Sequence, residues 1–287
     1  MGAVSVGFVK QFGANVMHLV QQKGSRLRPT VLVNPDGPIV GEEAFFDQLG
    51  TQTAQKKTTR NSDTPIGTPD HARRMVTLFD FELAVLHDKQ DQLKMLADPT
   101  SRYVQSQAFA LGRAMDTEII VAASGTAKTG KTGATSTTLP SAQKGVSASA
   151  GLTIAKLLSA KEILDAAETD PDEKRYCIVS AKQVTNLINT TEIKSADYNT
   201  VKALAAGQLN TFLGFEFVRS QRLETASSER LVLCYLRTGL VLAVAQEITT
   251  RMTERADKSY AMQVYASLGI GATRMEEEQI VQVACTE

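Results

Sequence analysis

The sequence predicts an α+β fold, and three observations support that class. Helical and extended patterns are scattered along the 287 residues without a repeating strand-helix alternation, which disfavours a doubly wound sheet. One segment in the first half has the apolar spacing of a single long helix. Between residues 51 and 70 the chain is polar and almost free of large apolar side chains, so this stretch cannot form a core of its own.

The composition is that of a globular chain, because hydrophobic residues make up 43% of it. Lys plus Arg and Asp plus Glu both number 31, so no overall field draws the chain to nucleic acid or to a membrane surface. Cys177, Cys234 and Cys285 lie in apolar surroundings, which predicts buried free thiols in a reducing cytoplasm. With no signal peptide and no apolar stretch of membrane-spanning length, we expect neither secretion nor a membrane.

The N-terminal third is predicted to contain a helix and a long two-stranded arm. Apolar residues at helical spacing indicate a helix over 8–22. After a proline-rich region the chain leaves the body near Gly41 and returns near Leu86, with a polar tip over 56–70. Alternation from Met75 onward indicates one long returning strand. Because two strands alone are marginal in water, the arm needs a surface outside its own body; a disordered loop is the alternative.

The clearest helix is predicted to run from Asp98 to about Ala123. Asp98 can cap it, and Pro99 suits its first position. Apolar side chains recur every three or four residues along one face: Val104, Ala108, Leu111, Met115, Ile119 and Ala122. At ~1.5 Å per residue, such a helix is long enough to cross a whole domain.

The second half is predicted to mix short elements. A low-complexity stretch over 124–151 is typical of a surface loop. Helices are expected over 154–168, 181–189 and 198–206, and strands over 175–180 and 212–220. The segment 230–248 is strand or strand plus helix, and 259–285 is two strands about a turn that contains Gly269 and Gly271.

One motif suggests nucleotide chemistry. The stretch "GTAKTGKT", Gly125 to Thr132, matches the phosphate-loop pattern with Lys131 as its lysine. A phosphate loop needs a strand before it and a helix after it, so that backbone amides converge on the phosphates. Here a long helix precedes the motif, and a poor helix former containing Pro140 follows it. We therefore interpret the motif as a flexible connector.

Other catalytic patterns are weaker still. "LGIGATR" begins like a dinucleotide fingerprint, but Arg274 stands in place of the third glycine, so a hairpin turn is expected. The histidines are scattered without ligand spacing, and no nucleophile elbow is present. Asp80 and Glu82 are interpreted as solvated charges, and the run Glu276–Glu278 as a solvated face or a site for a basic partner. We expect no catalytic residue, no metal and no cofactor, and hence no enzyme.

Three stretches carry a resemblance to a known family. They are "DPTSRYVQSQAFALGRAMDTEII" in the long helix, "LNTFLGFEFVRSQRL" with its turn at Leu213–Gly214, and the N-terminal "FVKQFGANVMHLVQQKGSRLRPTV". In chain order they are the N-terminal segment, the long helix and the turn with its strand, with the polar arm between the first two. In that order they resemble the major capsid proteins of tailed bacteriophages, which have the Hong Kong 97-type fold. The likeness is greatest to those of short-tailed phages.

The resemblance implies a division of the chain into five parts. Residues 1–40 would be an N-terminal arm and 41–86 the extended loop that lies across a neighbouring subunit. Residues 87–172, with the long spine helix, and 237–287 would form the peripheral domain. Residues 173–236 would be the axial domain, whose tips meet at five- and six-fold positions.

The resemblance also implies the function and the partners. The chain would self-assemble through hexamers and pentamers into an icosahedral head around double-stranded DNA, in the host cytoplasm, and remain in the virion. No long N-terminal scaffolding region is present, so a separate scaffolding protein is expected, with a portal and a decoration protein. DNA would be bound without sequence reading, with Lys128 and Lys131 as candidate phosphate contacts. The alternatives are an encapsulin-like compartment and a nucleotide hydrolase using Lys131.

Candidate contacts between subunits follow from charge and from position in the expected layout. They are Arg26, Arg28, Lys56, Lys57, Arg60, Arg73, Arg74, Glu276, Glu277 and Glu278.

Overall fold

A computed structural model describes residues 21–61, 63–64, 66–87, 100–145, 150–170, 172–189 and 211–287. The predicted helix over 198–206, the cap residues Asp98 and Pro99, and nearly all of the helix expected over 8–22 lie outside the described residues. Contacts divide the chain into two compact units. The first comprises 1–25, 80–114 and 246–269, and the second comprises 26–79, 115–245 and 270–287.

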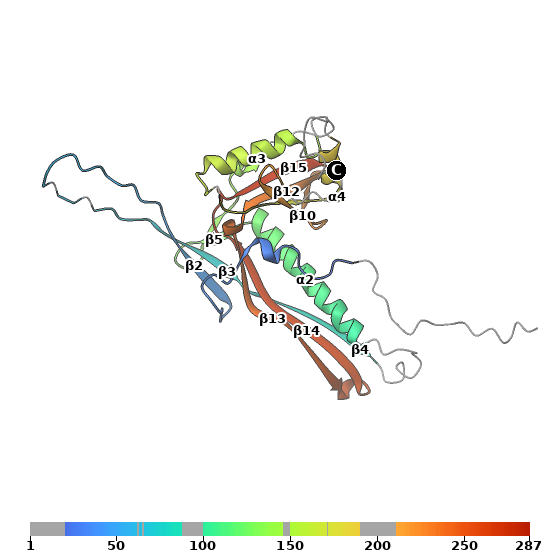
Figure 1. Ribbon diagram of the computed structural model, residues 1–287. Helices are drawn as coiled ribbons and strands as arrows, with labels where there is room; N and C mark the ends of the chain where they lie inside the picture. Colours follow the sequence, from blue (N-terminus) through green and yellow to red (C-terminus); the bar gives the residue numbers. More distant parts are fainter. Residues whose placement is uncertain are drawn as a thin grey trace, which may run out of the picture. The chain divides into compact units, whose positions relative to one another are not determined.

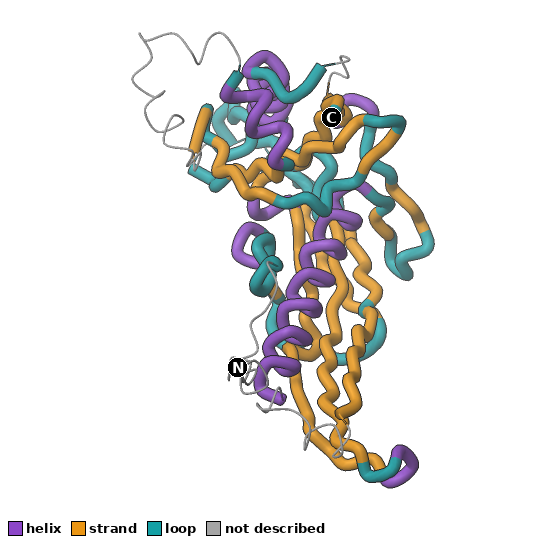
Figure 2. The backbone as a smooth tube through the Cα atoms, turned by 90° about the vertical axis from the view of Figure 1, so that its right-hand side faces the viewer, coloured by secondary structure: helices purple, strands orange, loops and turns teal. Residues whose placement is uncertain are grey.

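The first unit joins a helix to long strands. Helix α2 (Thr100–Ser124) confirms the predicted long helix. Long strands lie beside it in Figure 2, and a hydrogen bond joins it to strand β14 (Ala261–Arg274). The buried Gln107 donates from Nε2 to the carbonyl of Val264 over 2.9 Å. Gly112 is a site of close approach, because a Cβ there would lie 2.7 Å from the backbone of Gly24. The first unit is therefore held by helix-to-strand packing and by a backbone-to-backbone contact.

A four-stranded sheet contains the longest strands. Its order is β1 (Leu32–Val33), β13 (Leu240–Arg255), β14 and β4 (Phe79–His87). Strand β1 is parallel to β13, with Leu32 opposite Val241. The part of the chain over 240–255 is strand throughout, so the helical alternative for this region is wrong.

The core of the second unit is a seven-stranded sheet. Its strands in order are β7 (Lys144–Gly145), β15 (Ile280–Thr286), β12 (Glu229–Leu236), β8 (Arg175–Val179), β10 (Phe215–Arg219) and β9 (Thr211–Phe212), with β11 (Thr225–Ala226) paired to β12. All five residues of β8 are buried, as expected for a central strand. The same unit contains α3 (Ile154–Ala166), which packs against β15, and α4 (Ala181–Ile188).

Side chains cap both helices of this unit. Thr153 accepts a hydrogen bond from the backbone of Lys156 at the start of α3, and Ser180 does the same for Gln183 at the start of α4. The predicted helices over 154–168 and 181–189 and the strands over 175–180 and 212–220 are thereby confirmed to within a few residues. Short 3-10 turns complete the described chain over Arg28–Thr30, Ser141–Gln143, Arg237–Gly239 and Ala256–Lys258.

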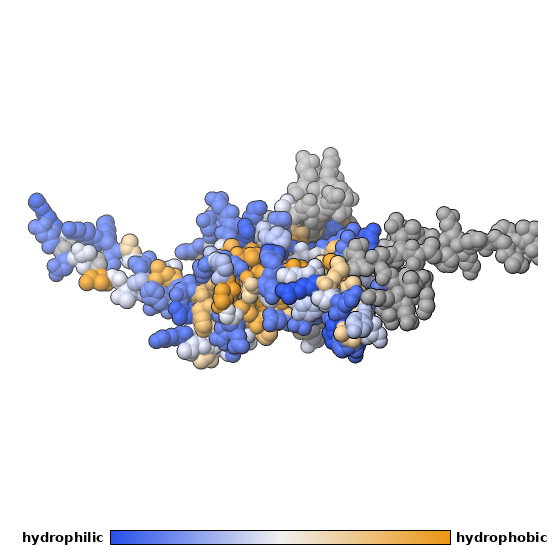
Figure 3. Space-filling view, turned by 90° about the horizontal axis from the view of Figure 1, so that it is seen from below, coloured by the Kyte–Doolittle hydropathy of each residue, from blue (hydrophilic) through white to orange (hydrophobic). Residues whose placement is uncertain are grey.

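The predicted arm is present as an antiparallel pair. Strand β2 (Glu43–Leu49) pairs with β3 (His71–Thr77) in the register Glu43 opposite Thr77 to Leu49 opposite His71. The two segments of the arm, after Leu49 and before His71, continue without strand assignment to a distal tip (Figure 1). We call the described residues between 50 and 70 the distal loop. They are almost all exposed, and Figure 3 shows this extension as mainly hydrophilic.

The return from the arm differs from the prediction. A single strand from Met75 to the region of Leu86 was expected, but the chain breaks at Leu78 into β3 and β4, which belong to two different sheets. Alternation alone could not locate this break, because both strands keep the same period of two. The paired part of the arm therefore ends at Thr77.

The low-complexity stretch is also not a plain surface loop. Residues 127–137 form a hairpin of β5 (Ala127–Thr129) and β6 (Thr135–Thr137), and β5 pairs with β3, giving a four-stranded sheet β2-β3-β5-β6. The flexible-connector interpretation of the motif is therefore wrong. Backbone pairing with the base of the arm orders a sequence whose side chains gave no strand signal.

The predicted turn at Gly269 and Gly271 is wrong as well. Both glycines lie inside β14, and the turn falls at 275–279 between β14 and β15. A Cβ at position 271 would lie 2.3 Å from the carbonyl oxygen of Thr77. Gly271 is thus required for close approach of two backbones rather than for a turn.

Candidate functional site

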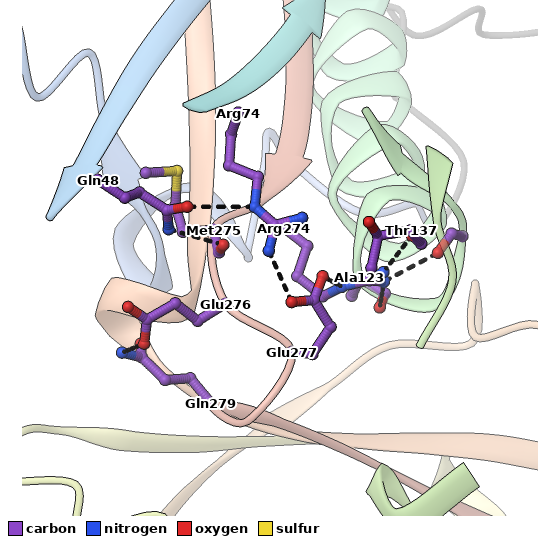
Figure 4. Close-up of polar contacts among 10 residues, drawn as sticks. Gln48, Arg74, Ala123, Thr137, Arg274, Met275, Glu276, Glu277 and Gln279 are labelled. Carbon is purple, nitrogen blue, oxygen red and sulfur yellow. Dashed lines mark hydrogen bonds and ion pairs between the residues drawn. The ribbon is translucent and has the colours of Figure 1, made fainter. Parts of the chain in front are cut away.

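Arg274 forms the centre of a buried polar network in the second unit. Its side chain is fully buried, and its guanidinium donates to the carbonyls of Ala123 (3.1 Å), Gly125 (2.8 Å) and Thr137 (2.9 Å) (Figure 4). Ala123 lies in the last turn of α2, so the arginine satisfies a carbonyl at the end of that helix. Burial lowers the pKa of Arg274, and the Glu277 carboxylate opposes this effect.

Glu277 connects this arginine to the base of the arm. Its Oε1 lies 3.4 Å from Nε of Arg274, and its Oε2 accepts from Nη2 of Arg74 over 2.6 Å. On β2, Gln48 accepts from Nε of Arg74 over 3.3 Å and donates to the carbonyl of Met275 over 2.8 Å (Figure 4). These side chains fix both strands of the arm to the turn between β14 and β15. We call the set Arg74, Arg274, Glu277 and Gln48 the arm clamp.

A second buried carboxylate orders the segment before the arm. Asp116 on α2 is fully buried and accepts from the backbone nitrogens of Arg26 (3.0 Å) and Leu27 (3.0 Å). Nearby, the hydroxyls of Thr30 and Tyr235 are 2.6 Å apart, and burial raises the pKa of Tyr235. In the sequence, Asp116 is only one residue of the long-helix stretch that resembles the capsid family. A lone Asp on an apolar helix face is nevertheless a usable signal of a carboxylate that binds backbone nitrogens.

The predicted contact residues fall into an exposed group and an internally paired group. In the exposed group, Lys56, Lys57 and Arg60 lie on the distal loop and Glu278 lies in the turn between β14 and β15. Glu276 is exposed and accepts a hydrogen bond from Gln279. Arg26 is exposed and donates a hydrogen bond to the carbonyl of Arg219. Arg28 is half-buried and has a partner within the chain.

The internally paired group lies at the base of the arm. Arg74 and Glu277 are bonded to each other in the arm clamp, with Arg74 only 8% exposed. Arg73 donates from Nη2 to Asp47 over 3.1 Å, and its guanidinium lies 5.6 Å from the ring centroid of Phe45. The hydrogen bond from Arg73 holds the pKa of the Asp47 carboxyl below its usual range.

Lys131 lies in the turn between β5 and β6. The motif is preceded by α2 and followed by a strand, so no helix N-terminus faces the position where phosphates would lie. The fixed spacing of two glycines and a lysine therefore occurs here without the phosphate-loop geometry.

The three thiols are buried and free, as predicted. Cys177 and Cys234 face each other across paired strands with their sulfurs 3.3 Å apart. Burial raises the pKa of Cys177 well above its ordinary value and that of Cys285 to about 11. Such thiols are poor nucleophiles at neutral pH.

No group of three His, Cys, Asp or Glu side chains within the described ranges is placed to hold a metal ion. Among the helices that the structure describes, none combines the length and apolar character needed to cross a membrane.

Several solved structures with this architecture are capsids of phages. The chain is similar to the capsid of cyanophage P-SCSP1u with a TM-score of 0.73 and 16% identity, over 98% of this chain and 93% of that one. It is similar to the capsid of Ralstonia phage GP4 with a TM-score of 0.73 and 11% identity, over 97% and 95% of the two chains. A chain from Mycobacterium phage Che8 matches with a TM-score of 0.70 and 14% identity, over 96% and 97%. The fold is therefore the Hong Kong 97-type fold of phage capsid subunits.

The sequence comparison identifies the family. A family model described as phage capsid protein matches residues 4–287, and the chain belongs to that family. Among curated proteins, none matches this chain significantly in sequence. The protein is a structural protein of a phage head, where copies of it associate into the capsid shell of the virion.

Proposed function

We propose that the chain builds this shell by laying its extended loop, residues 41–86, across a neighbouring copy. The observation that carries the proposal is the contrast between the two ends of the arm. Its base is fixed by the arm clamp, and its distal loop is exposed over nearly every described residue. A hydrophilic extension without a core loses conformational freedom for no gain in a monomer, whereas a neighbouring surface can order it.

The other parts of the chain take the roles of the Hong Kong 97-type layout in this proposal. Residues 1–40 form the N-terminal arm, and 87–172 with 237–287 form the peripheral domain around α2. Residues 173–236 form the axial domain, whose copies meet around the five- and six-fold axes in pentamers and hexamers. The chain works without catalysis, because repeated weak contacts in a closed shell need no reacting group.

The proposed partners are those of a head that is filled through one vertex. They are a scaffolding protein during assembly, a portal at that vertex, a decoration protein on the finished surface, and double-stranded DNA held without sequence reading. The equal numbers of acidic and basic residues, 31 of each, suit a shell that encloses DNA without binding it strongly.

The experiment is charge reversal at the tip of the arm. Lys56→Glu, Lys57→Glu and Arg60→Glu together should leave the melting temperature of the monomer unchanged, because these side chains are exposed. We expect the triple variant to form few or no shells by velocity sedimentation and negative-stain microscopy. The matched control exchanges the same residues with charge preserved, Lys56→Arg, Lys57→Arg and Arg60→Lys, and should assemble. Normal shells from the reversed variant would remove the tip from the subunit contact, and an enzyme cargo inside the particles instead of DNA would favour the compartment alternative.

A further inference from the structure

A cleft of about 700 Å³ lies at the base of the arm, between strand β3 and the β5–β6 turn. Its charged and titratable wall residues are Asp47, His71, Arg73, Arg74, Lys131 and Glu277. The cleft thus brings Lys131 of the phosphate-loop-like motif against the arginines of the arm, which the sequence places more than 50 residues away.

The charges of this wall do not cancel. Arg73 is paired with Asp47, and Glu277 is shared between Arg74 and Arg274. The wall carries three permanent cations, Arg73, Arg74 and Lys131, against two carboxylates. Within the part of the chain that the structure describes, no carboxylate lies within ion-pair distance of the Lys131 ammonium. The cleft is therefore one negative charge short of neutrality.

A buried donor in the same wall also lacks an acceptor. Arg74 is 92% buried, and among the described residues nothing accepts a hydrogen bond from its Nη1. Its other nitrogens are used by Gln48 and Glu277. Nη1 itself has almost no accessible surface, so Arg74 contributes positive charge to the wall rather than an open donor.

We propose that this cleft receives the carboxylate of an aspartate or glutamate side chain from a second copy of the chain. A carboxylate supplies the single negative charge that the wall lacks, and the exposed ammonium of Lys131 is the donor that it can reach. The proposal rests on the assembly of copies described above, since assembly is what brings a second copy to this surface.

The phosphates of packaged DNA fit the same cleft less well. Asp47 and Glu277 line the wall beside the cations, so a continuous polyanion would bring many charges against two carboxylates. A lone carboxylate from a protein neighbour brings one charge and leaves the existing ion pairs in place.

The test is zero-length cross-linking in shells of mixed isotopic composition. Nitrogen-15-labelled and unlabelled chains are assembled together, treated with a carbodiimide that joins amines to carboxylates in direct contact, and digested for mass spectrometry. We expect a peptide containing Lys131 to be joined to an acidic peptide, with heavy-to-light pairs present. The formation of shells is read separately, so a failure of assembly counts against the proposed function and a missing cross-link in intact shells counts against the cleft.

Two variants sharpen the test. Lys131→Gln should raise the concentration needed for half-assembly about 10-fold, because one desolvated ion pair per subunit is lost. Lys128→Gln is the matched control, because Lys128 lies on the same hairpin, donates to Ser136 over 2.9 Å and is not part of the cleft wall. Cross-links found only within one isotope would assign Lys131 to carboxylates of its own chain and overturn the proposal. Normal assembly of Lys131→Gln with weaker retention of DNA would overturn it in favour of a phosphate.

Discussion

The seven-stranded sheet and the arm sheet belong to the same compact unit but are stabilised differently. In the first, β8 is buried at every position, and Phe215 and Leu233 are fully buried. In the second, Phe46 and Val76 are buried at the base, whereas the distal loop is exposed. Hydrophobic burial therefore extends along the first sheet, whereas in the second a small apolar cluster around Phe46 and Val76 and the polar arm clamp hold only the base. A shell subunit needs both, because the first gives a stable monomer and the second remains available to a neighbour.

The largest loss of stability is expected at Arg274, the fully buried residue of the arm clamp. Arg274→Met would leave Glu277 and three carbonyls without their buried donor, and breaking such a buried pair costs about 3–5 kcal/mol of unfolding free energy. Urea denaturation of the monomer measures it. Arg73→Met is the matched control on the exposed arm pair and should cost far less, because an ion pair in contact with water contributes little to stability. Equal losses for the two arginines would contradict the division into clamp and surface.

Substituting one phenylalanine in each sheet compares how much hydrophobic burial stabilises the two sheets. Phe215 on β10 is fully buried, and Phe45 on β2 is 38% exposed. Phe215→Ala should cost about 3–5 kcal/mol, and Phe45→Ala should cost about 1 kcal/mol, because its side chain already contacts water. The measurement is again denaturant unfolding of the monomer. A Phe45→Ala loss as large as that of Phe215→Ala would mean that the arm contributes to the core.

Gly271 in strand β14 and Gly67 on the distal loop compare the body of the molecule with the arm tip by how closely other atoms approach the backbone. Gly271→Ala places a methyl group 2.3 Å from the carbonyl of Thr77 and should destabilise the monomer by about 1–3 kcal/mol. Gly67, on the distal loop, has only the side chain of Gln52 at 4.0 Å, so Gly67→Ala should change the melting temperature little. Thermal unfolding of both variants decides the point, and a stable Gly271→Ala protein would show that β14 can move away from Thr77.

The smallest change in stability is expected for the arm at acidic pH. Because hydrogen bonding to Arg73 lowers the folded-state pKa of Asp47, the pair stabilises the arm above the unfolded pKa of about 4. The contribution falls as pH drops through the lower folded-state value. We expect a slight loss of arm stability below about pH 4, measured by amide exchange of β2 and β3, and absent in Asp47→Asn. An identical acid response in that variant would assign the effect to other carboxylates.

Much of the body could be predicted from local signals in the sequence. The stripe from Val104 to Ala122 and the apolar run of β8 fixed a long helix and a buried strand, since periodicity and apolar runs report burial directly. The Thr- and Lys-rich composition of residues 50–70 likewise indicated a segment without a core, and the exposed distal loop agrees with it.

The site could be predicted only in part. The charge of Arg73, Arg74 and Glu277 predicts that they make contacts, but nothing in the local sequence indicates that Arg74 and Glu277 meet each other, because 203 residues separate them. Arg274 was noted only as the residue that spoils a glycine motif, although an arginine in an apolar strand is a usable signal of a buried partner.

The sequence by itself determined the helices Thr100–Ser124, Ile154–Ala166 and Ala181–Ile188, the central strands, the buried thiols and the polar arm, because each depends on side chains that are neighbours along the chain. Tertiary structure alone decided the break at Leu78, the place of Gly271 inside a strand, and the pairing of the "GTAKTGKT" segment with the arm. These features depend on backbone hydrogen bonds and contacts between distant segments, which leave little trace in local composition.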